Sequence, residues 1–241
     1  MRQTITNNNF NEIRSFVSVE DLKLYYVMDY LGNKVFVYNE NWEYQRTITP
    51  PSNEYPSSGP IYSININGSI FVTSSNVINK YDNYLNLTKQ VSSPGSSIYY
   101  NSANQMIYVA KYSSNSINVY DKDLNFIRTI STNYWPLFIT EYNGQMVVTD
   151  TNSGNIYLYQ GESLFRTVST FCTWGITSVL FDNNNQMIVS CVNSNIYIYN
   201  VDGTYTGLQV TACNGYYKNF VNFDSQDRLV VICYYRVEIY Y

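Results

Sequence analysis

A short segment with a tyrosine near its end recurs six times along the chain. Examples are VFVYN, NVYD and YIYN, and the recurring tyrosines are Tyr38, Tyr81, Tyr120, Tyr159, Tyr199 and Tyr240. Their spacing of about 40 residues is typical of four-stranded propeller blades. Each period also holds short runs of alternating or β-branched apolar residues, separated by Asn, Asp, Gly and Ser, as expected for strands joined by turns. The repeat therefore predicts an all-β fold, a six-bladed β-propeller with four antiparallel strands per blade.

The two ends of the chain supply complementary parts of one blade. The third period predicts strands over residues 97–101, 106–112, 116–121 and 126–132, whereas the last period supplies only three, over 220–224, 228–234 and 236–241. The N-terminal RQTIT resembles the fourth strand of other periods, such as FIRTIS at Phe126–Ser131. We therefore expect residues 1–7 to complete the last blade and close the ring, which makes residues 1–241 a single domain.

Parts of the repeat resemble the NHL-type propeller repeat, in which a strand is followed by Ala-Asp, a Gly/Asn-rich turn, and a strand ending in an aromatic residue and Asp. Residues 107–110 (IYVA) with 114–121 (SNSINVYD) follow this order, and so do Asp150 with Gly154-Asn155 and, more loosely, Asp29 with Gly32-Asn33. Ser74, Cys191 and Cys233 stand near the family's Asp in the other units. The resemblance implies a six-bladed propeller and leaves the ligand open, since such propellers include binding modules and enzymes.

The composition excludes several classes of function. The chain has no histidine, which removes Ser/His/Asp and Cys/His catalysis and His-ligated metal sites. Only 13% of residues are charged and the net charge is −4, so no basic field is available for nucleic acid. No apolar run is long enough to span a bilayer, and the start MRQTITNNNF lacks the apolar core of a signal peptide. We expect no cofactor, no membrane insertion, and a cytoplasmic or particle-associated location.

The four cysteines, Cys172, Cys191, Cys213 and Cys233, include no CxxC pair. We expect them to be reduced, buried thiols in a reducing compartment. Zinc binding by four thiolates is the alternative, but equivalent positions on neighbouring blades are usually too far apart for it.

A polar residue lies at the end of each predicted inner strand, and these residues are Glu20, Asn65, Asn101, Glu141, Asp182 and Asp224. Six oxygen-bearing groups around an axis could bind calcium, as in gluconolactonase-type propellers, which this chain resembles only in blade number. Side chains of these types also close turns by bonding to the backbone, and we favour that role here and for Asp29 and Asp150. No catalytic and no metal-binding residue is therefore assigned.

Large aromatic residues are concentrated in the loops that the topology places on one face, namely those entering the first strand of a blade and those joining its second and third strands. The candidate ligand-binding residues are Tyr55, Tyr112, Tyr134, Trp135, Trp174, Tyr216, Tyr217 and Tyr234. Such side chains offer rigid apolar area with a polar tip, which suits sugar stacking or a protein contact.

These observations favour a non-enzymatic binding or assembly module that recognises a glycan or protein partner through aromatic loops on one face. One alternative is a calcium-dependent hydrolase or lactonase-like enzyme that uses the axial carboxylates. The other is a structural subunit of a virion or extracellular assembly. The sequence leaves the oligomeric state open.

Overall fold

The computed structural model describes residues 2–7, 9–29, 31–49, 62–73, 76–93, 95–193, 195–213 and 220–241. Apart from two 3₁₀ turns, η1 (Glu20–Leu22) and η2 (Tyr112–Ser114), their regular structure is β-strand, in six four-stranded antiparallel sheets. The all-β, six-bladed propeller architecture predicted from the repeat is confirmed. No helix in these ranges has the length and apolar character needed to cross a membrane.

The chain divides into two compact units, one formed by Met1–Ile98 with Asn222–Tyr241 and the other by Tyr99–Val221. That the two units form one domain stays a prediction. Sheets that lie wholly or mostly in the first unit have the orders β2-β3-β4-β5, β6-β7-β8-β9 and β22-β23-β24-β1. Their strands are β1 (Arg2–Thr6), β2 (Ile13–Val19), β3 (Leu24–Asp29), β4 (Lys34–Asn39), β5 (Tyr44–Ile48), β6 (Tyr62–Ile66), β7 (Ser69–Thr73), β8 (Val77–Asp82), β9 (Leu87–Ser92), β22 (Phe220–Phe223), β23 (Leu229–Cys233) and β24 (Arg236–Tyr240).

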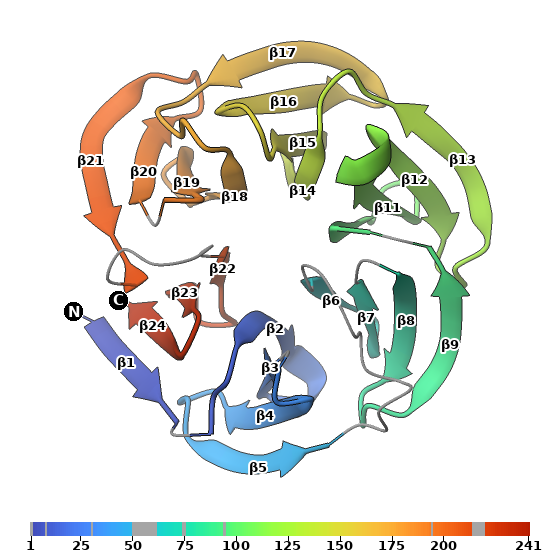
Figure 1. The fold of residues 1–241 in the computed structure, drawn as a ribbon, viewed down its shortest axis with the longest axis vertical. Helices are drawn as coiled ribbons and strands as arrows, with labels where there is room; N and C mark the ends of the chain where they lie inside the picture. The colour runs from blue at the N-terminus through green and yellow to red at the C-terminus, as the bar shows by residue number, and fades with distance from the viewer. Residues whose placement is uncertain are drawn as a thin grey trace. The chain divides into compact units, whose positions relative to one another are not determined.

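The second unit has the sheets β10-β11-β12-β13, β14-β15-β16-β17 and β18-β19-β20-β21 (Figure 1). Their strands are β10 (Ser97–Asn101), β11 (Met106–Lys111), β12 (Ser116–Asp121), β13 (Phe126–Ser131), β14 (Pro136–Tyr142), β15 (Gln145–Asp150), β16 (Asn155–Gln160), β17 (Ser163–Ser169), β18 (Ile176–Phe181), β19 (Gln186–Cys191), β20 (Asn195–Asn200) and β21 (Tyr205–Thr211). In the third period, which comprises β10 to β13, the observed strand bounds differ from the predicted bounds by at most one residue.

The N-terminal strand completes the last blade, as expected. β1 pairs antiparallel with β24 in a register that places Arg2 opposite Tyr240 and Ile5 opposite Val237. The buried carboxylate of Glu238 on β24 accepts hydrogen bonds from Arg2 at 2.5 Å and from Arg236 at 2.7 Å. Chain ends therefore meet in one sheet, and this pairing covers an edge of β24 that would otherwise be open.

Packing between adjacent sheets explains why the second and third strands are apolar on both faces. In the first unit, Val17 and Tyr26 of one blade pack with Ile70 and Val72 of the next. In the second unit, Val119 packs with Val148 in the same way. Fourth strands such as β5 and β13 are largely exposed, because no further strand of their own sheet covers them.

Turns between the third and fourth strands follow one recurring plan. Asn39, Asp82 and Asp121 each accept backbone N–H bonds through a side-chain oxygen from residues two and four positions later. The third residue after each of them has a positive φ and a buried side chain, and these residues are Trp42, Leu85 and Leu124. The turn is therefore closed by a polar residue and anchored in the core by an apolar one.

Candidate ligand-binding face

Trp135 and Trp174 lie at equivalent positions, each just before the first strand of a blade in the second unit. Their side chains are 47% and 73% exposed, and they precede β14 and β18 respectively. Both residues lie outside the strands, as expected for residues of the loops that enter the first strand of a blade. Large exposed aromatic side chains on loops are typical of recognition surfaces.

Hydrogen bonds from backbone groups of the Trp174 loop hold this loop in place. The N–H of Thr170 bonds to the carbonyl of Gly154 at 2.7 Å, and the N–H of Phe171 bonds to the hydroxyl of Tyr199 at 2.8 Å. On the far side of Trp174, the carbonyl of Gly175 accepts a bond from Val192 at 3.1 Å. A loop fixed on both sides of an exposed indole loses little further conformational entropy when a ligand binds.

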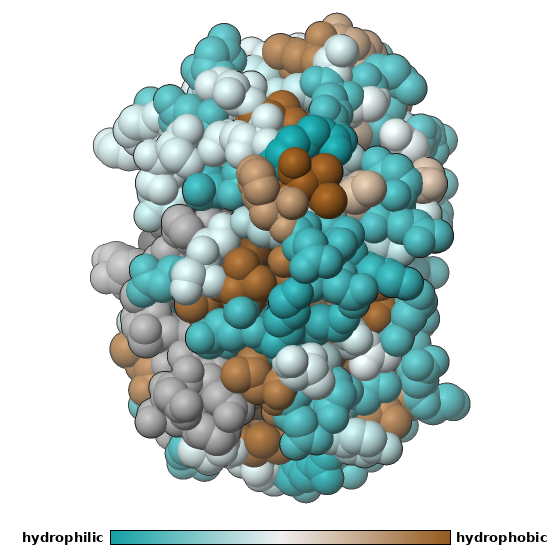
Figure 2. Space-filling model, turned by 90° about the vertical axis from the view of Figure 1, so that its right-hand side faces the viewer, coloured by the Kyte–Doolittle hydropathy of each residue, from teal (hydrophilic) through white to brown (hydrophobic). Residues whose placement is uncertain are grey.

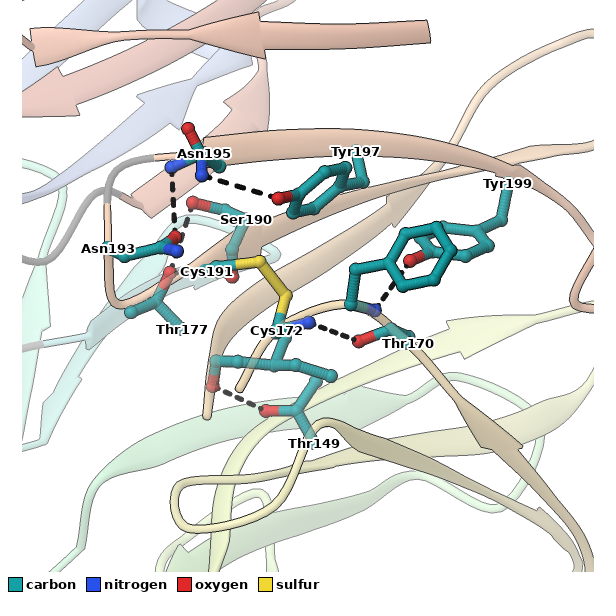
Figure 3. The surroundings of a disulfide bond; sticks show 12 residues. Thr149, Thr170, Cys172, Thr177, Ser190, Cys191, Asn193, Asn195, Tyr197 and Tyr199 are labelled. Carbon is teal, nitrogen blue, oxygen red and sulfur yellow. Dashed lines mark hydrogen bonds between the residues drawn. A yellow bond between two sulfur atoms is a disulfide. The ribbon is translucent and has the colours of Figure 1, made fainter. Parts of the chain in front are cut away.

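A disulfide between Cys172 and Cys191 ties the same loop to the end of β19 (Figure 3), with the two Cα atoms 5.2 Å apart. Cys213 and Cys233 are also disulfide-bonded, and the chain has no free cysteine. The expectation of four reduced thiols is therefore wrong. That expectation rested on the absence of a CxxC pair, whereas Cys172 and Cys191 are 19 positions apart and lie at the entrance and the second strand of one blade.

The loop that carries Trp135 contacts the Trp174 loop through Thr151. The carbonyl of Trp135 accepts a bond from the N–H of Thr151 at 3.0 Å. The carbonyl of Thr151 lies so close to Gly175 that any Cβ added there would overlap it. Gly175 also has a φ of 97°, a conformation that favours glycine. Thr151 thus fixes the two indole-bearing loops relative to each other.

Tyr112 adds a third aromatic side chain, 40% exposed, from the η2 turn that follows β11. Of the neighbouring loop residues, Ser113, Ser114, Ser153 and Thr173 are small and uncharged. The nearby Asp150 is buried, and its carboxylate accepts bonds from Asn152 and Ser153. We name Tyr112, Trp135 and Trp174 the aromatic face. It offers ring surfaces and hydroxyl groups with little charge.

Tyr134 does not belong to this face, contrary to the sequence-based expectation. Its side chain is only 5% exposed, stacks on Tyr157 with ring centroids 3.7 Å apart, and shares a hydrogen bond with the hydroxyl of Tyr159 at 2.6 Å. Burial and the bond to Tyr159 raise the pKa of Tyr134 above its usual value. The side chain turns inward because the ring of Tyr157 on β16 provides a flat apolar surface for it.

The remaining predicted site residues lie elsewhere. Tyr234 belongs to the first unit, is half-buried, and donates a hydrogen bond from its hydroxyl to Glu12 at 3.1 Å. Tyr55, Tyr216 and Tyr217 lie outside the described residues.

Phe171 is an exposed aromatic residue that the sequence analysis did not select. It lies three residues before Trp174, is 55% exposed, and packs edge to face with Tyr205 at a centroid distance of 5.1 Å. The adjacent Cys172 could have drawn attention to Phe171, but only if the sequence analysis had predicted the disulfide. Hydrophobic residues also occur elsewhere on the surface, as small patches separated by hydrophilic residues on the side shown in Figure 2.

The polar residues at the ends of the inner strands mostly close turns. Side-chain oxygens of Asn101, Asp182 and Asp224 accept backbone N–H bonds from the residue two positions later at 2.9 Å, and Glu141 accepts one from Gly144 at 3.2 Å. Asp29 likewise accepts bonds from Glu12 and Gly32. Glu20 and Asn65 do not follow this plan. In the described ranges no three acidic or cysteine side chains are grouped as a metal site would require.

Solved structures with this fold include lyases and a WD40 domain. A streptogramin B lyase has 10% identical residues and a TM-score of 0.71, covering 99% of this chain and 96% of its own. A catalytically inactive variant of virginiamycin B lyase from Staphylococcus aureus, solved with quinupristin, has 11% identity and a TM-score of 0.72, covering 99% and 98%. The WD40 β-propeller domain of Doa1 has 12% identity and a TM-score of 0.68, covering 94% and 78%.

At these identities the similarity establishes the propeller fold and no more. A scan against protein-family models finds no match, and a search of curated proteins finds none either.

Proposed function

We propose that this chain is a non-enzymatic binding module that recognises a neutral glycan through the aromatic face. The observation that carries the proposal is the pair of exposed indoles, Trp135 and Trp174, on loops that hydrogen bonds and a disulfide hold in place. Rigid aromatic rings surrounded by hydroxyl groups suit the apolar faces and hydroxyl edges of sugar rings. The small charge of these loops favours a neutral ligand.

Lack of histidine supports a binding role over a lyase-like one. The quinupristin-bound lyase variant described above is catalytically inactive and carries alanine in place of a histidine. This chain contains no histidine at all. A lyase reaction that depends on an imidazole as general acid or base would have no counterpart here.

A calcium-dependent hydrolase receives little support from the axial residues. Asn101, Glu141, Asp182 and Asp224 each use a side-chain oxygen on a turn, so few acidic oxygens are free to ligate an ion together. We also propose that the repeat is of the NHL type, as its resemblance to that repeat suggests.

The disulfides support an oxidising environment for the mature protein, because cystines persist mainly outside the reducing cytosol. Among the settings considered from the sequence, an extracellular assembly therefore fits better than the cytoplasm.

Binding to an array of neutral glycans, followed by calorimetry with the strongest hit, tests the proposal. We expect Trp135→Ala and Trp174→Ala each to weaken binding by about 1–3 kcal/mol. The matched control Phe165→Ala removes a comparably exposed aromatic ring from β17 and should leave the affinity unchanged. The affinity should change little with salt, because the proposed ligand is uncharged.

Three outcomes would contradict the proposal. They are absence of binding across the array, unchanged binding by the double tryptophan variant, and calcium-dependent turnover of a lactone or ester substrate. The last would restore the hydrolase alternative.

A further inference from the structure

The loop that carries Trp174 has one side at the surface and a disulfide bond on its other side. Phe171 and Trp174 are exposed, whereas Cys172 between them and its partner Cys191 are almost fully buried. Both cysteines belong to an apolar cluster of the second unit that also contains Ile176. A change in the state of the sulfur atoms therefore acts on the same short loop that presents the indole.

The two ends of this disulfide differ in their freedom to move. Cys191 is the last residue of β19, which pairs with both β18 and β20, and it lies opposite Ile176. Cys172 precedes β18, and its carbonyl accepts a bond at 3.3 Å from the N–H of Gly175, which closes a turn around Trp174. Any change in the distance between the two sulfur atoms should therefore displace the turn rather than the strand.

The loop has little room on the side opposite the disulfide. The carbonyl oxygen of Cys172 lies 2.6 Å from the position that a Cβ on Gly154 would occupy, and the carbonyl oxygen of Thr170 lies 3.1 Å from it. The N–H of Thr170 also bonds to the carbonyl of Gly154. The loop is therefore packed between Gly154 and the end of β19, and Cys172 cannot retreat without a shift of the turn.

Reduction of the disulfide would require such a shift. A dithiol transfers two electrons and two protons to the cystine, which becomes two thiols, while the dithiol itself becomes a disulfide. The two sulfur atoms of the protein then separate by about 1.5 Å, the difference between a covalent bond and van der Waals contact. Cysteine thiols are compatible with an apolar interior, so the sheets should stay folded.

We propose that the Cys172–Cys191 bond is a redox switch for the aromatic face, in which the oxidised protein binds its ligand and the reduced protein is folded but binds weakly. The binding half of this inference rests on the proposed function. A shift of Gly175 also affects the second indole, because the carbonyl of Thr151 contacts Gly175 and the N–H of Thr151 bonds to Trp135. Ligand recognition is then confined to oxidising environments, where cystines persist.

Hydrogen exchange tests the switch without any ligand. The oxidised protein is compared with protein treated with dithiothreitol, a dithiol, and mass spectrometry after alkylation verifies that Cys172 and Cys191 are reduced. Amides in the peptide of residues 170–176 should exchange at least about tenfold faster after reduction, because the loop is no longer tied to β19. Exchange in β15 and β16 should stay slow.

Affinity for the neutral glycan selected from the array tests the functional half. Reduction should weaken binding by about tenfold or more, and reoxidation should restore it. The circular dichroism of the β-sheets should be the same before and after reduction.

Two variants assign the effect to one disulfide. Cys172→Ser with Cys191→Ser should bind as weakly as the reduced natural chain and should not respond to dithiothreitol. Cys213→Ser with Cys233→Ser is the matched control, because it keeps the two loop cysteines and should respond as the natural chain does. The reduction experiment on the natural chain does not depend on the folding of either variant.

Unchanged exchange and affinity after verified reduction would overturn the inference, because hydrogen bonds alone would then hold the loop. Resistance of the bond to dithiothreitol in the folded protein, or loss of β-sheet circular dichroism on reduction, would overturn it as well. If the oxidised protein binds no glycan, the proposed function fails. Faster exchange of residues 170–176 on reduction would still support redox control of the loop in that case.

Discussion

At the scale of single residues, glycines at positive φ differ in the space available to a side chain. Gly175 has a φ of 97° and its Cα faces the carbonyl of Thr151, where a Cβ would overlap. Gly161 has a φ of 63° with no atom within 4 Å of the position a Cβ would take. Comparison of substitutions at Gly161 and Gly175 therefore separates the free-energy cost of a positive φ from the free-energy cost of a steric clash.

Gly161→Ala should therefore destabilise the protein by about 1 kcal/mol, the cost of a left-handed alanine. Gly175→Ala should cost at least about 2 kcal/mol, because the clash adds to that strain. It should also weaken glycan binding, since relief of the clash moves the Trp174 loop. Urea denaturation of both variants measures the difference, and equal losses of stability would show that the contact with Thr151 does not constrain the loop.

Buried tyrosines set the alkaline limit of stability. Burial raises the pKa of Tyr38 to about 12, and burial with the hydrogen bond to the Glu238 carboxylate raises the pKa of Tyr240 to about 12. The unfolded chain ionises its tyrosines near pH 10. Since the folded state holds these protons more tightly, their contribution to stability is complete below pH 10 and is lost as the pH rises towards 12.

We therefore expect the free energy of unfolding to fall between about pH 10 and pH 12. Absorbance at the tyrosinate band should show one group of tyrosines that ionises with the protein folded and another that ionises only as the β-sheet circular dichroism is lost. Ionisation of every tyrosine near pH 10 without a change in circular dichroism would contradict this prediction.

At the scale of the element, β1 stabilises the last blade through both its backbone and Arg2. It pairs along β24, and Arg2 is one of the two arginines that bond to the fully buried carboxylate of Glu238. Removing residues 2–7 should cost at least about 3 kcal/mol, because it exposes the edge of β24 and removes part of the charge compensation of Glu238.

Thermal unfolding of the deletion variant checks this prediction, with Gln3→Ala as a control that keeps the strand. A synthetic peptide of residues 2–7 added in excess should restore part of the lost melting temperature. If the deletion leaves the melting temperature unchanged, β1 contributes nothing to the stability of the blade.

The strands could be predicted because their signals are local. Alternating apolar residues and Asn, Asp or Gly turns place β1, β10, β12 and β13 within a residue of their observed bounds. Buried apolar residues inside turns, such as Trp42, could not be predicted in this way. A large residue at positive φ is unfavourable locally, and its burial depends on the neighbouring blade, where its indole N–H bonds to Asp224 at 3.0 Å.

Contacts between residues that are far apart in the sequence could not be predicted either. Arg128 on β13 bonds to Glu162 in the turn of the next blade, and Arg166 on β17 bonds to the carbonyls of Val201 and Asp202. At the candidate site, the loop position of Trp174 could be predicted from the spacing of the strands, whereas burial of Tyr134 required the position of Tyr157 on another strand.

At the scale of the whole molecule, the repeat combines a uniform framework with loops that differ between blades. The same four-stranded sheet recurs six times, with similar turns between the third and fourth strands. The loops that enter the first strands are free to differ, and two of them carry Trp135 and Trp174. Under the proposed function, these loops recognise the ligand and the sheets hold them in place.

Tryptophan fluorescence tests this account most directly, because the chain has only three tryptophans and Trp42 is buried. Acrylamide should quench two of the three indoles in the free protein, and the neutral glycan selected from the array should protect those two. The variant with Trp135→Phe and Trp174→Phe should show weak quenching that the glycan does not alter. Weak quenching of the free protein, or quenching that the bound glycan leaves unchanged, would contradict the claim that the aromatic face is the binding site.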